Sequence, residues 1–350
     1  MQVGLDDAAV VFESISQPQE KLIAALYAGV SESQFEAFAS QNRVTPSEAK
    51  SLLRRLEPLM LTPEPPPEPR GVGRPRTKGI PEPLSSAARE AAFSELIRAS
   101  LLNGREPEAV FDERVRRMIH IDSLDRTGLS IVGALAAAGV GTFVTSDVVR
   151  VSSRDVGPVS YPAGLVGQTR LAAADWILKG SPTRARLVAA AKLASSTLDT
   201  LDAAVLVSQQ VLLPARYKTW MTRSTAHMAV VFDSSGVWVS PVIKPGEPGC
   251  LLCFDKRRSK ADSSWSAIAT QLRDSQLRFD DAASQLFAAA MVTKALTAQF
   301  DSTAPTPGVR FNALTGEVRE LDFGAHPDCE CWLEPQLGDK PRGAALETRV

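Results

Sequence analysis

Residues 115–145 run VRRMIHIDSLDRTGLSIVGALAAAGVGTFVT, and this stretch decides the fold of the larger part of the chain. Apolar residues fill most of 115–121 and all but the ends of 142–145, as in short buried strands. Between them, 129–138 is apolar and rich in alanine, which favours a helix that glycine at 139 would end. A strand, a helix and a second strand in this order predict the first βαβ unit of a parallel sheet.

The same alternation continues toward the C-terminus. A helix is expected at 168–178. The remaining predicted elements are strands at 186–190, 203–207 and 227–232, helices at 264–277 and 281–299, and a hairpin over 308–323 that turns at Thr315 and Gly316. These elements predict an α/β domain over residues 85–334, built on a doubly wound, mostly parallel sheet of the Rossmann-like kind.

Composition limits the classes of function. The net charge of −1 over 350 residues gives no general attraction to nucleic acid or to a membrane surface. The longest apolar runs, at 131–140 and 286–292, are far too short to cross a bilayer. The N-terminus has no basic segment followed by a continuous apolar one, so no signal peptide is expected. Together with cysteines that are expected to be free of disulfides, this predicts a cytoplasmic protein.

A proline-rich segment separates a small N-terminal module from this domain. The sequence PEPPPEP begins at residue 63, and glycine, proline and basic residues follow up to 84. Such a composition predicts an extended, semi-rigid linker over 63–84 with no core of its own. Residues 1–62 would then form the small module, and residues 335–350 a disordered tail.

The N-terminal module has the pattern of three short helices with a short wing. Helical spacing of apolar residues covers 19–28 and 32–40. Thr45 is placed as the N-cap of a third helix, with Pro46 in its first turn and Glu48 completing a capping box. Three helices in this order predict a winged-helix-like module. Such modules bind DNA, peptides or other proteins, so the fold alone does not choose among these ligands.

The linker also carries a basic motif. Its cations are Arg70, Arg74, Arg76 and Lys78, and the Gly-Arg-Pro-Arg sequence at 73–76 resembles the core of an AT-hook. A DNA-binding regulator built from the module and this linker is therefore one alternative function. A soluble basic linker is favoured over it, because so short a motif recurs by chance.

The four cysteines form two close pairs that are far apart in sequence, Cys250 with Cys253 and Cys329 with Cys331. Two such pairs predict one tetrahedral zinc ion held by four thiolates. Disulfides are the weaker alternative, because a pair separated by one residue bridges poorly. With no open coordination position the zinc would stabilise structure and take part in no chemistry. His326 adjoins the second pair and could replace one thiolate as a ligand.

The other two histidines, His120 and His227, fall within or at the start of predicted strands, which favours structural roles. No nucleophile elbow of the Gly-x-Ser-x-Gly kind appears in the sequence. Several short motifs, including those with the cysteines, are spread over the whole α/β domain. They are the sequences AAAGVG at 136–141, DVGP at 155–158 with Tyr161, SPVIKPG at 240–246, CLLC at 250–253, Trp265, Gln271, Leu272 and HPDCEC at 326–331.

These motifs together resemble the ThiF/MoeB-type adenylyltransferases, which are relatives of the ubiquitin-activating enzymes. Within that family the likeness is to proteins encoded with ribosomally made, modified peptides, including cyclodehydratase-associated proteins, and it covers roughly residues 110–332. The resemblance implies a role in peptide modification such as bacteriocin biosynthesis. It also implies a body that dimerises, and an N-terminal module that clamps a leader peptide.

The resemblance further implies a site for ATP and magnesium, and here the chain departs from the family. The first strand-to-helix turn should be rich in glycine, so that backbone amides approach a phosphate. In this turn, 122–128, only Gly128 falls on a family glycine, while Ser123 and Asp125 occupy the other two places. A carboxylate at Asp125 would repel phosphate by about 4 kcal/mol at 4 Å and an effective dielectric near 20.

Other positions of the implied nucleotide site differ as well. The acidic residue expected for the ribose falls on Thr145, with Asp147 two residues later. The phosphate-binding pair falls near Ser153 and Val156, with Arg154 close by. The expected magnesium-binding aspartate is replaced within Ser-Gln-Gln at 208–210, and a glutamine amide is a poor ligand for this hard cation.

These four replacements along one ligand predict an adenylation fold that has lost adenylation and binds a peptide or protein partner. A second alternative is an active adenylyltransferase with an altered site. In it Arg126, Arg154 and a helix starting at Gly128 would hold the anion, and Asp147 would serve the ribose. Nucleic acid binding through the linker, described above, is the other alternative.

Overall fold

The computed structural model describes residues 2–3, 10–12, 14–27, 30, 32–57, 85–104, 106–180, 185–273 and 275–331. The chain divides into two compact units, residues 1–68 with 100–106 and residues 69–99 with 107–350. The predicted linker at 63–84 and the predicted tail at 335–350 lie outside the described residues. Among the described helices, none has the length and apolar character that a membrane span requires.

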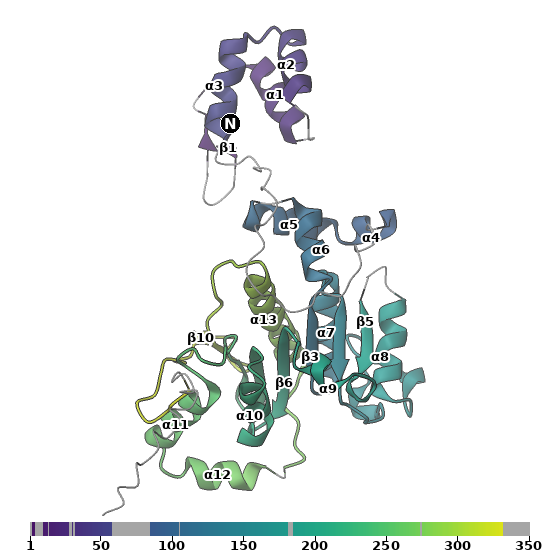
Figure 1. Ribbon diagram of the computed structural model, residues 1–350, viewed down its shortest axis with the longest axis vertical. Helices are drawn as coiled ribbons and strands as arrows, with labels where there is room; N and C mark the ends of the chain where they lie inside the picture. The colour runs from purple at the N-terminus through teal and green to yellow at the C-terminus, as the bar shows by residue number, and fades with distance from the viewer. Residues whose placement is uncertain are drawn as a thin grey trace, which may run out of the picture. The chain divides into compact units, whose positions relative to one another are not determined.

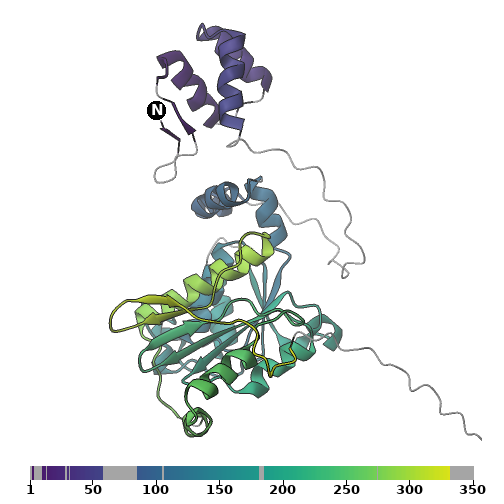
Figure 2. The same cartoon turned by 90° about the vertical axis from the view of Figure 1, so that its left-hand side faces the viewer.

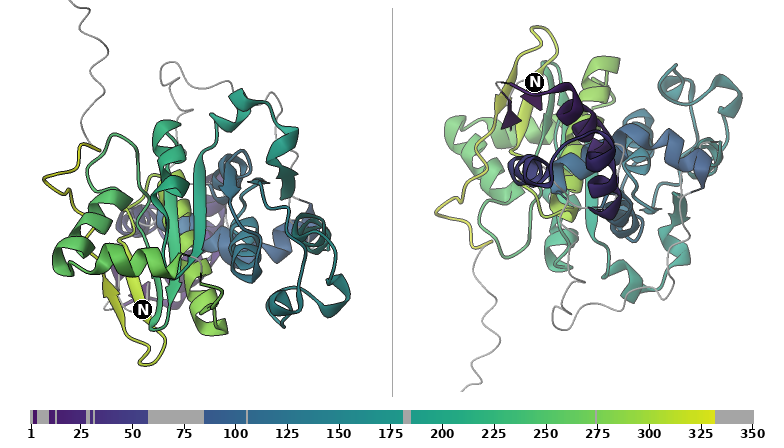
Figure 3. Two further views of the ribbon diagram at one scale, coloured as in Figure 1. Left: turned by 90° about the horizontal axis from the view of Figure 1, so that it is seen from below. Right: turned by 90° about the horizontal axis from the view of Figure 1, so that it is seen from above.

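The N-terminal unit contains three helices and a short two-stranded ribbon (Figure 3, right). Its elements are the antiparallel strands β1 (Gln2–Val3) and β2 (Val10–Val11) and the helices α1 (Gln17–Tyr27), α2 (Glu32–Gln41) and α3 (Pro46–Leu56). Leu22, Phe35 and Leu52 lie in its buried core. The predicted capping box is confirmed, because Thr45 accepts from the Glu48 amide and the Glu48 side chain accepts from the Thr45 amide.

The larger unit is built on one sheet of eight strands in the order β10-β9-β8-β7-β6-β3-β4-β5. Figure 1 labels β3, β5, β6 and β10 of this sheet. The strands are β3 (Met118–Ile121), β4 (Thr142–Thr145), β5 (Arg186–Ala189), β6 (Ala203–Gln209), β7 (His227–Asp233), β8 (Gly236–Val239), β9 (Val309–Asn312) and β10 (Val318–Glu320). Strands β5, β4, β3, β6 and β7 run parallel, and β8 to β10 add an antiparallel edge. This arrangement confirms the predicted doubly wound, mostly parallel sheet.

Helices cover both faces of the sheet, as Figure 2 shows from the side. The helices of the remaining chain are α4 (Ser86–Ala91), α5 (Phe93–Asn103), α6 (Pro107–Arg114), α7 (Arg126–Ala137), α8 (Arg170–Lys179), α9 (Ser195–Leu198), α10 (Pro214–Thr222), α11 (Leu251–Ala261), α12 (Trp265–Leu272) and α13 (Ala282–Phe300). Buried residues of α7, α8 and α13 share one core with one face of the strands. Those of α10 and α11 pack on the opposite face.

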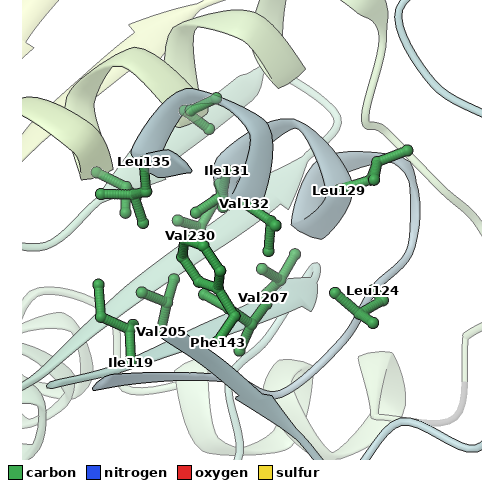
Figure 4. Close-up of a cluster of buried hydrophobic side chains, with 14 of the residues drawn as sticks. Ile119, Leu124, Leu129, Ile131, Val132, Leu135, Phe143, Val205, Val207 and Val230 are labelled. Atoms are coloured by element: carbon green, nitrogen blue, oxygen red, sulfur yellow. The ribbon is translucent and has the colours of Figure 1, made fainter. Parts of the chain in front are cut away.

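Helix α7 lies over the centre of the sheet and fixes the turn that precedes it. Its apolar stripe includes Ile131 and Leu135, which are fully buried against Ile119, Phe143 and Val205 of the strands (Figure 4). Burying side chains of this size contributes about 1.5–3 kcal/mol each. The turn between β3 and α7 is therefore held at a defined place at the carboxyl end of the sheet.

The structure corrects several predicted boundaries. Helix α7 begins at Arg126, three residues before the helix predicted at 129–138 and two before the Gly128 start of the anion-site alternative, because Asp125 caps it. Strand β3 begins at Met118 because Val115 still bonds to Phe111 at the end of α6. The helix predicted at 264–277 ends at Leu272 as α12. The strand β8 and the helix α11 were not predicted.

Candidate functional site

The N-terminus of α7 is the place where this fold would offer backbone amides to an anion. Here the side chain of Asp125 takes that place. Its Oδ1 accepts hydrogen bonds of 3.1 Å from the amides of both Thr127 and Gly128. The residue is 7% exposed. The donors that a phosphate would need are thus bonded to a carboxylate of the chain itself.

Arg278 closes over this carboxylate. Its Nη2 lies 3.2 Å from Asp125 Oδ2 and 2.5 Å from Asp280 Oδ2, and its Nη1 lies 3.7 Å from Asp155 Oδ1. Burial raises the pKa of Asp125, and the charge of Arg278 acts against that rise. The guanidinium therefore supplies the counter-charge that lets a buried carboxylate remain at the helix terminus.

Gln209, at the end of β6, holds the same segment. Its Oε1 accepts a 2.9 Å hydrogen bond from the amide of Phe279, next to Arg278. The sequence predicted that the magnesium-binding aspartate was replaced here, and the amide oxygen at this place is bonded to the chain. Residues 278–280 are thus tied to α7 by an ion pair and to the sheet by Gln209.

Asp147, predicted as a substitute ribose ligand, is occupied by structural contacts. Its Oδ2 accepts a 2.7 Å bond from the Leu124 amide and its Oδ1 a 2.7 Å bond from the Val149 amide. Arg170 lies 3.4 Å from the same Oδ2, and its Nη2 lies 2.8 Å from Asp155. The side chain of Asp147 is 3% exposed. Asp147 stabilises the β3–α7 turn through its bond to the Leu124 amide.

Gly128, the one glycine that matched the family pattern, has a packing role. A Cβ at this position would lie 1.8 Å from the backbone oxygen of Ser123. The close approach is between two parts of the same turn, so the glycine is needed for the turn to fold. Gly128 lies in the first turn of α7 and does not line the cleft described next.

Arg126 and Arg154, predicted as an altered anion site, are brought together at one cleft of about 660 Å³. Its lining comes from the first turn of α7, the turn at 153–155, the β7–β8 turn, residues 276–281 and the residue after β9. The lining residues are Arg126, Arg154, Asp233, Ser234, Gly236, Gln276, Leu277, Arg278, Phe279, Asp280, Asp281 and Ala313. The two predicted arginines thus share a surface, whereas Gly128 and Asp147 do not line it.

The sequence did not identify the residues of the site that are far from α7 along the chain. Arg278 lies 153 residues from Asp125, and Gln285 lies 159 residues from Arg126, which it contacts. Nothing in the sequence pairs such positions. A local signal for Asp125 was present, because an aspartate directly before an amphipathic helix is a typical N-cap.

The four cysteines meet on the other face of the sheet and form no disulfide. The Sγ atoms of Cys250 and Cys253 are 3.8 Å apart, those of Cys250 and Cys329 are 3.7 Å apart, and those of Cys253 and Cys331 are 3.6 Å apart. Four sulfurs about 2.3 Å from one zinc ion stand about 3.8 Å from one another in a tetrahedron. The four thiols therefore fit a tetrahedral metal ion such as zinc.

The surroundings of the cluster favour a thiolate at Cys253. Burial raises the pKa of Cys253, but amide donors including that of His326, 3.3 Å from its sulfur, lower it to about 7 overall. His326 uses its Nδ1 to accept a 3.2 Å bond from the Asp328 amide. The group of four ligand atoms within 4.8 Å of one another consists of the cysteines alone. His326, the alternative ligand considered from the sequence, is not a member of that group.

Comparison with known proteins adds to this geometry. No family model matches the sequence, and no curated protein matches it. Among solved structures, E. coli MccB with ATP has a TM-score of 0.61 at 14% identity, over 89% of each chain. The microcin C7 biosynthetic enzyme MccB with N-formylated MccA has a TM-score of 0.61 at 13% identity, over 89% of this chain and 90% of that one. PaaA has a TM-score of 0.56 at 14% identity, over 71% and 86%. The chain is similar to these proteins in fold, and this likeness agrees with the doubly wound sheet described above.

Proposed function

We propose that this chain is a ThiF-like protein of a peptide-modification pathway that binds a peptide or protein partner and makes no adenylate itself. Support for the pathway comes from the fold it shares with MccB, a microcin C7 biosynthetic enzyme solved with N-formylated MccA. The N-terminal unit, with its two-stranded ribbon beside three helices, would serve as the clamp for a leader peptide. An added peptide strand is a common way for such an edge to bind.

The observation that carries the proposal is the occupied α7 N-terminus. Its first free amides bond to Asp125, and Arg278 covers the same carboxylate. A phosphate at this place would have to displace a buried ion pair and would meet a like charge. Magnesium would find the Gln209 amide already bonded to Phe279. Binding ATP in the manner of an adenylyltransferase would therefore require rebuilding the site.

We propose a structural role for a zinc ion at the four cysteines. The ion would join the start of α11 to the segment after β10, closing a long loop whose ordering costs conformational entropy. Cys250 and Cys253 would supply one pair of ligands, and Cys329 and Cys331 the other. With four sulfur ligands the ion would offer no position to a substrate.

The test is a calorimetric titration of the whole chain with a synthetic peptide, made to the sequence of the precursor-peptide gene that we expect beside its own. We expect binding that is unchanged by Mg–ATP, together with no ATP–pyrophosphate exchange. E. coli MccB, whose structure with ATP is known, is assayed beside the chain under the same conditions. Peptide-dependent pyrophosphate exchange by the chain would refute the proposal and support an active adenylyltransferase.

A further inference from the structure

The cleft beside the occupied helix terminus carries two cations that the fold leaves available. Arg126, Arg154 and Arg278 line it, as do Asp233, Asp280 and Asp281. A count of charges alone would make the surface neutral. Which charges can act on a ligand depends on the partners that each side chain already has.

Two of the three carboxylates are paired with arginines, and the third caps a helix. Asp233 Oδ1 and Oδ2 lie 2.7 and 2.9 Å from Arg310 Nη2. Asp280 is bonded to Arg278 through both oxygens. Asp281 caps α13 by accepting from the amides of Ala283 and Ser284 at 3.0 and 3.2 Å. Arg278 is likewise committed, to Asp280 and Asp125.

Arg126 is held in place through one nitrogen only. Its Nε donates a 2.8 Å hydrogen bond to Oε1 of Gln285, which is fully buried. Gln285 is fixed in turn, because its Nε2 donates to the Arg126 carbonyl and to Ser130 Oγ at 3.1 and 2.5 Å. Neither Nη of Arg126 bonds to any residue that the structure describes. An arginine with a fixed plane and two free terminal nitrogens is prepared to bind a carboxylate with two hydrogen bonds.

Arg154 supplies the second cation. It is an exposed residue of the turn at 153–155, and within the described ranges its side chain has no hydrogen bond or ion pair. The turn itself is firm, because Asp155 accepts from the Ser152 amide and hydroxyl at 2.9 Å and pairs with Arg170. The two available arginines therefore stand on two fixed elements at one cleft.

The geometry points to this cleft as the binding site for a carboxylate of a bound peptide, with Arg126 as the bidentate anchor and Arg154 as a second contact. This inference rests on the proposed function and names the chemistry of its partner. A carboxylate is favoured over a phosphate because the helix amides that would share a phosphate charge are bonded to Asp125. The carboxylate could belong to an acidic side chain or to the peptide C-terminus.

Three labelled nonapeptides of glycine and serine test the inference on the whole chain by fluorescence polarisation. The first carries two glutamates and an amidated C-terminus, the second carries two glutamines and an amidated C-terminus, and the third carries two glutamines and a free C-terminus. We expect the first or the third to bind at least tenfold more tightly than the second, and the tighter of the two identifies the source of the carboxylate. The double variant Arg126→Gln, Arg154→Gln should remove that preference.

The matched control is Arg319→Gln, which removes one exposed arginine of β10 outside the cleft. It should change each dissociation constant by less than twofold, and melting curves should show that all variants are folded. Arg126→Lys keeps the charge but loses the fork, so it should lose most of the Arg126 contribution. Equal binding of all three peptides, a preference unchanged in the double variant, or displacement of the peptide by pyrophosphate would each overturn the inference.

The outcome also separates this inference from the proposed function. If Mg–ATP stabilises the chain while the peptide preference still depends on Arg126, the proposed function fails and the inference stands. If Mg–ATP has no effect and the double variant keeps the preference, the inference alone fails.

Discussion

Replacing Asp125 with alanine tests whether the chain fills its own anion site. The substitution removes the cap of α7, with its two 3.1 Å hydrogen bonds, and one ionic partner of Arg278. Loss of an N-cap costs about 0.5–2 kcal/mol. Breaking a buried ion pair by removing one partner costs about 3–5 kcal/mol, and less here because Arg278 keeps Asp280.

We therefore expect Asp125→Ala to lower the free energy of unfolding by about 3 kcal/mol. Two variants separate the contribution of the helix cap from that of the ion pair. Asp125→Asn keeps a good N-cap and loses only the charge, so it should cost about 1–2 kcal/mol. Asp281→Ala removes a cap of the same geometry on α13 at an exposed position, with no ion pair in the described chain, and should cost about 1 kcal/mol.

Urea unfolding followed by tryptophan fluorescence measures these differences. All five tryptophans lie between residues 176 and 332, so the signal reports on the α/β unit. The ion pair has no energetic role if Asp125→Ala costs no more than Asp281→Ala. A cost below about 0.5 kcal/mol would mean that Asp125 does not cap α7 at all, and the account of the filled site would be wrong.

Three further predictions concern metal, packing and pH. Cys253→Ser should lower the zinc content, measured by elemental analysis, and the melting temperature together; wild-type protein without zinc and with paired, oxidised thiols would contradict the site. Gly128→Ala should prevent stable folding because its Cβ would lie 1.8 Å from a backbone oxygen, whereas Gly133→Ala, with nothing within 4 Å, should be neutral or stabilise α7 by about 0.5–1 kcal/mol; equal unfolding energies would contradict this packing. Burial lowers the pKa of His120 from 6.5 to about 4, so the unfolded chain takes up this proton first. Stability from the neutral ring is full above pH 6.5, and about 3 kcal/mol is lost as the pH falls toward 4; His120→Gln should flatten the pH dependence in this window, and an unchanged slope would refute the assignment.

The parts of the fold that depend on short-range patterns were predictable from the sequence. The strand at 142–145 was predicted with its observed limits, and the α3 capping box was predicted residue by residue. The cysteine pairs predicted their own proximity because metal-ligand spacing is a local pattern. By contrast, β8 is a short strand of four residues that becomes recognisable only through its pairing with β7 and β9.

The candidate site was predictable only in part, because it is made by contacts over long distances in sequence. The replacements at Asp125 and Gln209 could be seen, but the partners that they hold could not. The residues 278–280 were assigned to the space between two helices, and tertiary bonds to Asp125 and Gln209 hold them there. Local sequence patterns do not indicate which residues pair over such distances. The hydrogen bond from Arg126 to Gln285 is a second example.

Nucleotide binding by the wild-type chain tests the central claim most directly. A ligand at one hundred times its dissociation constant stabilises a protein by about 2.7 kcal/mol. For a unit of this size that would raise the melting temperature by about 5–10 °C. We predict no shift for this chain with Mg–ATP at millimolar concentration, beside a clear shift for E. coli MccB in the same buffer. A saturable rise of several degrees in the chain, lost with Arg154→Gln, would contradict the account of a nucleotide site occupied by its own residues.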